Sequence, residues 1–156
     1  MAISSRFSVA VHIISLLEIS KNERLTSELI ASSVNTNSVV VRRIMSMLNK
    51  AGIIHTSPGV AGAIISRPIA QITLLDVYLA VEVDHQDHLF SIHDKANPNC
   101  LVGKNIQHTL DQRFTQAQRA MENELASVTL EQIITDLLVK DSSISSTPTT
   151  TKKEQL

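Results

Sequence analysis

The order of helix-like and strand-like segments in the first 66 residues constrains the fold of this chain more than any other feature. Apolar residues recur at helical spacing in three stretches, which predicts helices over 5–20, 27–33 and 38–51. Two apolar runs, 53–56 and 63–66, then flank a turn that contains Pro and Gly, and this pattern predicts a β-hairpin. Three helices followed by a hairpin make a winged helix-turn-helix domain, so we expect a mainly α fold with a small β-hairpin.

The third expected helix has one apolar face and one polar face. Its inward positions, at helical spacing, are Val41, Ile44, Met45 and Leu48. In a helix-turn-helix pair the second helix enters the major groove, and its first residues meet the base edges. The residues that this helix and the turn before it present to DNA are Thr36, Asn37, Ser38, Val39, Arg42 and Arg43.

Three of these residues have distinct expected contacts. Arg42 lies one turn into the helix on its outward face, and Arg pairs with guanine through two hydrogen bonds. Arg43 lies at the border of that face, where we expect a phosphate contact, and Val39 can pack against a thymine methyl group. The alternative is an ordinary solvated helix surface. Outside this helix, the expected DNA-contacting residues are Ser5, Arg6 and His55.

The charge of the chain is unevenly distributed. The net charge is −1, but residues 1–67 carry seven basic and three acidic residues, whereas residues 68–156 carry seven basic and twelve acidic ones. A basic front half beside an acidic back half is typical of a nucleic-acid-binding domain on an acidic support. Aromatic residues make up only 3% of the chain, which disfavours binding of single strands or RNA by stacking. The expected partner is therefore double-stranded DNA.

The second half of the chain predicts an oligomerisation segment. A short helix is expected over 73–81, and a long helix from about Cys100 to Ser127. The long helix has a narrow apolar stripe that one chain cannot bury well, so we expect it to pack against a second copy. The expected interface residues are Ile106, Leu110, Phe114, Ala117 and Met121. A last helix is expected over 130–139.

These segments give the expected domain organisation. Residues 1–82 form the winged helix-turn-helix domain and 83–99 a connecting loop. Residues 100–140 form the dimerisation helix and the C-terminal helix. The tail 141–156 is rich in Ser, Thr and Lys, contains Pro148, and is expected to be disordered.

Three motifs resemble the Rrf-two family of bacterial winged-helix transcriptional regulators. Residues 3–12 resemble the start of its first helix. Residues 35–44, with 51–54 after them, resemble its recognition helix and following strand, and residues 97–103 resemble a segment of one subgroup. The resemblance implies a homodimer joined through the long helix. It also implies that two winged heads bind a near-palindromic operator and that the role is repression.

The chain departs from the family pattern in two places. Members that sense with an iron–sulfur cluster carry three cysteines between the wing and the long helix, whereas this chain has only Cys100. The resemblance is therefore to a subgroup without the cluster cysteines, and no cofactor is expected. The family's glycine-rich wing also carries a basic residue, which segment 57–63 lacks.

Cys100 is a candidate redox sensor, because a helix N-terminus lowers the pKa of a thiol. The alternative is an inert cysteine at the dimer interface. Zinc-type ligands surround Cys100 in the sequence, but their spacing matches no compact metal motif, so no metal site is expected. The residues considered as ligands are Asp84, His85, Asp87, His88, His93, Asp94 and His108.

The sequence favours a DNA-binding transcriptional regulator over other classes of protein. No catalytic motif is present, so an enzyme is not expected. No apolar run reaches the ~18 residues that a membrane span needs, and a single cysteine forms no internal disulfide. We therefore expect a cytoplasmic homodimer that responds to a redox or small-molecule signal. The alternative is a winged-helix protein-interaction module that no longer binds DNA.

Overall fold

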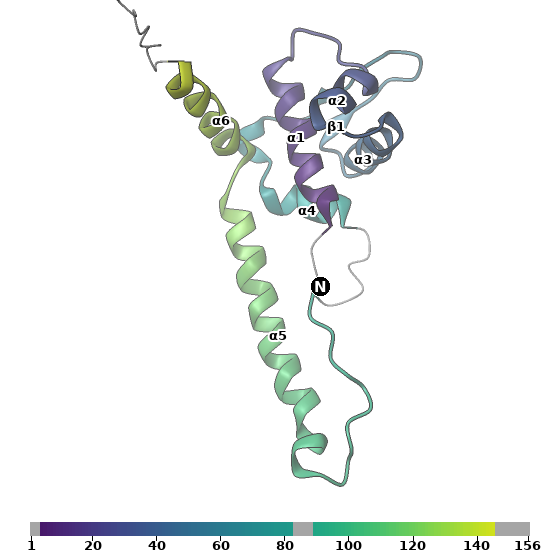
Figure 1. The fold of residues 1–156 in the computed structure, drawn as a ribbon, viewed down its shortest axis with the longest axis vertical. Coiled ribbons are helices and arrows are strands. Elements are labelled where there is room, and N and C mark those ends of the chain that lie inside the picture. Colours follow the sequence, from purple (N-terminus) through teal and green to yellow (C-terminus); the bar gives the residue numbers. More distant parts are fainter. Residues whose placement is uncertain (1–3, 83–88, 146–156) are drawn as a thin grey trace, which may run out of the picture.

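Three helices and a two-stranded hairpin form the head of the molecule, in the order that the sequence predicts (Figure 1). The computed structural model describes residues 4–82 and 89–145. The helices are α1 (Ser5–Ile19), α2 (Ser27–Val34) and α3 (Ser38–Lys50), and the strands are β1 (Ile54–His55) and β2 (Ile64–Ile65). The strands pair antiparallel, with Ile54 opposite Ile65. The expected winged helix-turn-helix fold is confirmed.

Short polar side chains set where these helices begin. Thr26 caps α2 by accepting a hydrogen bond from the backbone N–H of Leu29, and Asn37 caps α3 by accepting one from Val40. Between the two helices, Asn35 adopts a left-handed conformation with φ of 60°. Asn tolerates this conformation better than most residues, and it ends α2 so that the chain turns directly into α3.

The core of the head is built from aliphatic side chains, and it extends beyond the three helices and the hairpin to side chains of segment 72–81 and to Leu130. The helical spacing seen in the sequence brings one face of each helix inward, and the predicted inward face of α3 is buried. The largest completely buried side chains are Ile13, Ile14, Ile30, Val41, Ile44, Leu48, Ile53, Ile54, Ile72, Val77, Val81 and Leu130.

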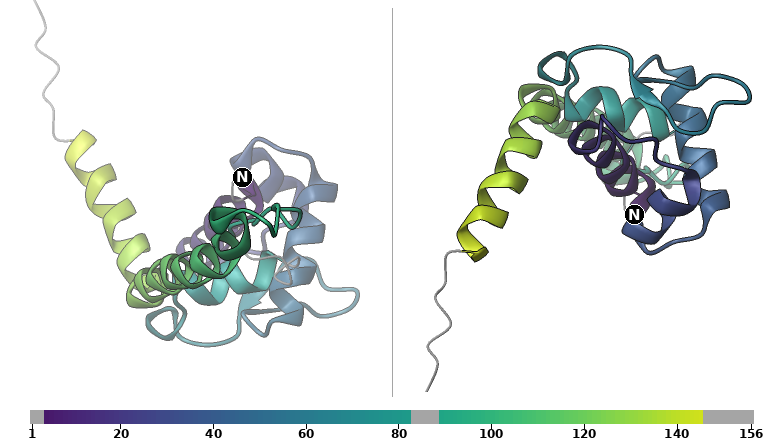
Figure 2. Two further views of the ribbon diagram at one scale, coloured as in Figure 1. Left: turned by 90° about the horizontal axis from the view of Figure 1, so that it is seen from below. Right: turned by 90° about the horizontal axis from the view of Figure 1, so that it is seen from above.

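The remaining helices attach to the head at one junction. These are the short turn η1 (Ile69–Gln71), α4 (Leu74–Val81), α5 (Leu101–Ser127) and α6 (Leu130–Ser145). The backbone N–H of Leu130 donates to the carbonyl of Ile72 at 2.8 Å, and that of Leu74 donates to Val128 at 2.9 Å. These bonds hold the α5–α6 connection against the start of α4, while α5 projects away from the head (Figures 1 and 2).

The described part of the segment between α4 and α5, residues 89–100, runs alongside α5. The aromatic rings of Phe90 and Phe114 stack with centroids 4.9 Å apart, and the side chain of Gln107 donates to the carbonyl of His93 at 2.7 Å. The first part of this loop, residues 83–88, lies outside the described residues. None of the described helices is long and apolar enough to cross a membrane.

One expected boundary is wrong. The helix expected to end at Val139 continues to Ser145, so residues 141–145 of the segment expected to be disordered are helical. The hydroxyls of Ser142 and Ser143 donate to the carbonyls of Leu138 and Val139, one turn earlier, and satisfy groups at the helix end. Residues 146–156 of the expected tail lie outside the described residues.

Candidate nucleic-acid interface

The outer face of α3 is open to solvent along its whole length. Val39 is 66% exposed, and Arg42, Arg43, Ser46 and Asn49 are exposed on the same side. The opposite side of the helix is packed into the core, so this face cannot rotate inward without unfolding the head. The surface predicted to enter a groove is therefore rigid and accessible.

The start of α3 combines polar side chains with free helix-end groups. The side-chain oxygen of Asn37 accepts from Val40 at 2.9 Å, which leaves its amide NH₂ group outside this cap bond. Thr36 is half-buried, and its backbone N–H donates to Ala31. The N–H groups of Ser38 and Val39 precede the first intrahelical bonds, and such groups at a helix N-terminus attract phosphate. The first turn of α3 can therefore receive a phosphate.

Arg42 is held by two residues of α2. Its Nη1 atom donates to the Ser27 hydroxyl at 3.1 Å and to Glu28 Oε1 at 3.0 Å. The backbone N–H of Glu28, helped by hydrogen bonds from Arg42 and Ser27, holds the pKa of the Glu28 carboxyl below its ordinary value. The sequence did not indicate Ser27 or Glu28 as site residues, because their contact with Arg42 depends on the angle between α2 and α3.

The predicted contacts at the start of α1 have an internal competitor. Arg6 Nε donates to the Ser4 hydroxyl at 3.0 Å, and its Nη2 lies 3.8 Å from Glu82 Oε2. Glu82 Oε1 is buried and accepts no hydrogen bond from the described residues. Ser5 is exposed. A phosphate contact by Arg6 stays a prediction, and it would have to compete with Glu82 for the guanidinium.

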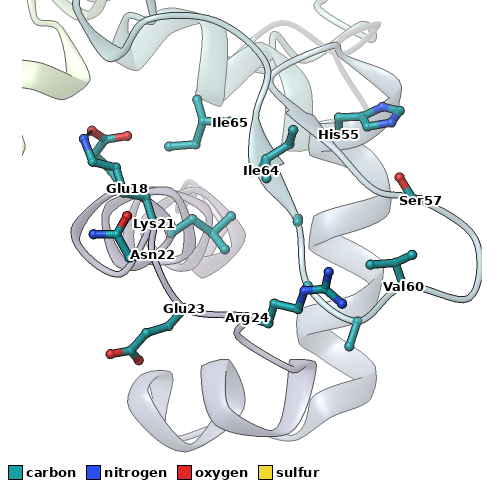
Figure 3. Close-up of a pocket in the computed structure, with 14 residues that line it drawn as sticks. Glu18, Lys21, Asn22, Glu23, Arg24, His55, Ser57, Val60, Ile64 and Ile65 are labelled. Atoms are coloured by element: carbon teal, nitrogen blue, oxygen red, sulfur yellow. Dashed lines mark hydrogen bonds and ion pairs between the residues drawn. The ribbon is translucent and has the colours of Figure 1, made fainter.

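The wing lies beside α3 and carries no charge. His55 on β1 is exposed, but segment 56–66 contains neither a basic nor an acidic residue. A hollow of about 510 Å³ separates the wing from the end of α1 and the loop between α1 and α2 (Figure 3). Arg24 of that loop reaches toward the wing at Val60 (Figure 3).

Cys100 lies immediately before α5 and is exposed. The backbone N–H groups of Gly103 and Val102 in the first turn of α5 lower the pKa of the Cys100 thiol, as expected at a helix N-terminus, although the thiol forms no capping hydrogen bond. A Cβ at position 103 would collide with the carbonyl of Asn97, so the turn that carries Cys100 packs closely on α5.

The histidines near Cys100 form no metal site within 4–82 and 89–145. No group of three His, Cys, Asp or Glu side chains in those ranges could hold a metal ion. His93 and Asp94 are exposed, and His108 is hydrogen-bonded to Gln112. The other four residues considered as ligands, at positions 84, 85, 87 and 88, lie outside the described residues.

The apolar stripe of α5 remains partly exposed in the single chain. This helix has 27 residues, and none of them is buried. Ile106, Leu110, Phe114 and Met121 are half-exposed and Ala117 is exposed, while Phe114 is partly covered by Phe90 of its own chain.

Comparison with known proteins gives consistent matches over most of the chain. Residues 3–136 match the Rrf2 family, described as iron-dependent transcriptional regulators. YwnA of Bacillus subtilis, provisionally named an HTH-type transcriptional regulator, is 52% identical over 135 residues, which cover 86% of this chain and 98% of YwnA.

Solved structures show the same fold. One, described as a DNA-binding protein on provisional grounds, is 49% identical with a TM-score of 0.67, and the match covers 83% of this chain and 99% of that one. CymR of B. subtilis, described as the global cysteine regulator, has a TM-score of 0.63 at 18% identity, with 86% of this chain and 97% of CymR covered.

Proposed function

The chain belongs to the Rrf2 family of DNA-binding transcriptional regulators, and on that premise we propose that it is a homodimeric repressor that binds a near-palindromic operator through α3 of each protomer. The observation that carries this proposal is the division of α3 into a buried apolar face and an exposed face with Val39, Arg42 and Arg43. A rigid helix with an accessible polar face is what major-groove recognition requires.

The dimer in this proposal forms through α5. At about 1.5 Å per residue this helix is roughly 40 Å long, and its apolar stripe has no buried residue in the single chain. A second α5 packed along the stripe would remove Leu110 and its apolar neighbours from water. Two heads joined in this way present two recognition helices, and helix-turn-helix dimers generally bind half-sites about one helical turn, roughly 34 Å, apart.

The donor set of this chain does not fit a cysteine-held iron–sulfur cluster. Such a cluster needs several thiolates, and this chain has one cysteine, which lies exposed at the start of α5. We therefore assign no cluster to the proposed regulator. Within the proposal Cys100 is the candidate site for a redox signal, since an exposed thiol with a lowered pKa is more often in its reactive thiolate form.

The second candidate function is a winged-helix module that binds another protein. The uncharged wing favours this alternative, because wing contacts to DNA usually use positive charge. The pairing of Arg42 with Glu28 also favours it, since an arginine whose charge is offset by a carboxylate attracts DNA less strongly.

Selection of DNA fragments from random and genomic pools by the purified protein tests the proposed function. We expect recovered sequences to contain an inverted repeat, and binding to weaken steeply with added salt as counterions are released from the phosphates. Enrichment of no sequence, together with binding that is insensitive to salt or absent, would favour the protein-interaction module.

A further inference from the structure

The wing of this protein lacks the charge that a DNA contact at this position needs. Segment 56–66 is uncharged, although the minor-groove edge of a duplex has a strongly negative potential that attracts Arg and Lys. The wing nevertheless adjoins the recognition surface. Val60, Ala61 and Gly62 line two hollows, one shared with Arg42, Ser46 and Asn49 of the α2–α3 side and the other shared with Arg24. A duplex that contacts α3 would therefore also approach this side of the head.

The backbone of the loop between α1 and α2 packs directly on the wing. At Gly62, where φ is +92°, a Cβ would lie 3.3 Å from the carbonyl oxygen of Leu25 and 3.8 Å from the Cα of Arg24. This φ and this close approach both favour glycine at position 62. Because Leu25 is anchored in the core at 8% exposure, the position of Arg24 relative to the wing is fixed from both sides.

Arg24 is also an uncommitted cation. Its side chain is exposed and forms neither an ion pair nor a hydrogen bond within the described residues. The other charged side chains that line the hollow do not pair with Arg24. Lys21 is paired with Glu18 at 3.3 Å, and the Glu23 side chain points away from Arg24 (Figure 3). The guanidinium of Arg24 extends toward Val60 in the wing (Figure 3). His55 is the remaining titratable group that lines this hollow.

We propose that Arg24 supplies the cationic DNA contact that the wing itself lacks, by binding a backbone phosphate at the edge of the minor groove beside the major groove that α3 occupies. This inference rests on the proposed function. In it the wing provides shape and the adjacent loop provides charge, so that the two segments act together as one contact surface. A phosphate contact carries no base information, so Arg24 adds affinity but no sequence preference.

The test is the salt dependence of binding to the selected operator for Arg24→Ala. Each phosphate contact contributes a slope of about −0.9 to the plot of log affinity against log salt, so a dimer that loses two contacts has a slope shallower by about 1.8. A fourfold rise in salt should therefore weaken the variant about 12-fold less than it weakens the unchanged protein. The loss should be the same for every operator sequence.

Two further variants make the test specific. Lys21→Ala removes the same charge from the same loop, but this lysine is already paired with Glu18, so its slope should match that of the unchanged protein. Ala61→Arg combined with Arg24→Ala moves the guanidinium onto the exposed wing and should restore the slope. Circular dichroism establishes that each variant folds.

The outcomes separate this inference from the function on which it rests. If the unchanged protein binds no DNA, both are wrong. If it binds the operator and Arg24→Ala has an unchanged slope, the assignment of Arg24 alone is wrong. A variant that changes the preferred bases but not the slope also overturns the phosphate role.

Discussion

Replacement of Arg42 by alanine probes how α3 recognises its operator. Both hydrogens on Nη1 are used by Ser27 and Glu28, at 3.1 and 3.0 Å. The guanidinium keeps its Nε and Nη2 donors, which lie on one edge of the plane and form a fork. That edge matches the O6 and N7 acceptors of guanine. Ser27 and Glu28 thus orient Arg42 for base recognition without occupying the edge that would contact the base.

The expected magnitude follows from this fork. A well-formed bidentate contact contributes about 1–3 kcal/mol of discrimination against the wrong base, which is roughly 5- to 160-fold at one base pair in each half-site. The exposed ion pair with Glu28 adds little to folding. The Arg42→Ala variant should therefore keep its thermal unfolding midpoint while it loses preference at that base pair.

The assay is fluorescence anisotropy with a panel of operators in which each position carries each of the four bases. Arg43→Ala is the matched control and should weaken all operators alike with a shallower salt slope. Glu28→Ala should reduce the same preference as Arg42→Ala, and the double variant should be no worse than Arg42→Ala alone. Equal loss by Arg42→Ala on every operator would refute base recognition and leave a phosphate contact.

Two other predictions concern the long helix. Leu110→Asp should convert the dimer to monomers that bind the operator poorly. The control variant Gln116→Asp changes an exposed position and should remain dimeric, as measured by light scattering. A dimeric Leu110→Asp variant would show that the interface lies elsewhere. Cys100 should react with iodoacetamide at lower pH in the folded protein than in urea, because N–H groups at the start of α5 stabilise the thiolate and lower the thiol pKa. The Gly103→Ala variant disturbs the turn against Asn97 and should raise the pH at which Cys100 reacts. Identical pH profiles in the folded and unfolded protein would show that the fold does not lower the thiol pKa.

The sequence predicted those parts of the structure that depend on local periodicity. The buried face of α3 was predictable because one helix places Val41, Ile44 and Leu48 on the same side, whatever the rest of the chain does. The caps at Thr26 and Asn37 are local in the same way, since a cap bonds to the helix that it starts.

The features that the sequence did not predict depend on how separate elements pack. Arg42 meets Glu28 only because α2 and α3 cross at a particular angle, and Arg24 reaches the wing only because Gly62 allows the loop to approach. The predicted end of α6, at Val139, was wrong for a different reason. Serines favour turns and disorder in general, but Ser142 and Ser143 donate to carbonyls of their own helix.

The ion pairs of the head determine how many cations are free to contact DNA, and so how strongly salt should weaken binding. Four of the seven basic residues of segment 1–67 are paired with carboxylates, which leaves Arg24, Arg43 and Lys50 unpaired within the described part of the chain. A dimer whose phosphate contacts come only from these residues neutralises six phosphates and has a salt slope of about −5.4.

A slope much steeper than about −5.4, approaching about −12.6 if all fourteen basic residues of the two heads contact DNA, would mean that the paired residues also leave their carboxylate partners to bind phosphate. A slope near zero would mean that the free cations of the head contact no DNA. Arg24→Ala removes one third of the free cations, so it should change the slope from about −5.4 to about −3.6. Both slopes must correspond to the same number of phosphate contacts per free cation. The two measurements therefore test whether the internal ion pairs, rather than the net charge of the chain, determine how strongly it holds DNA.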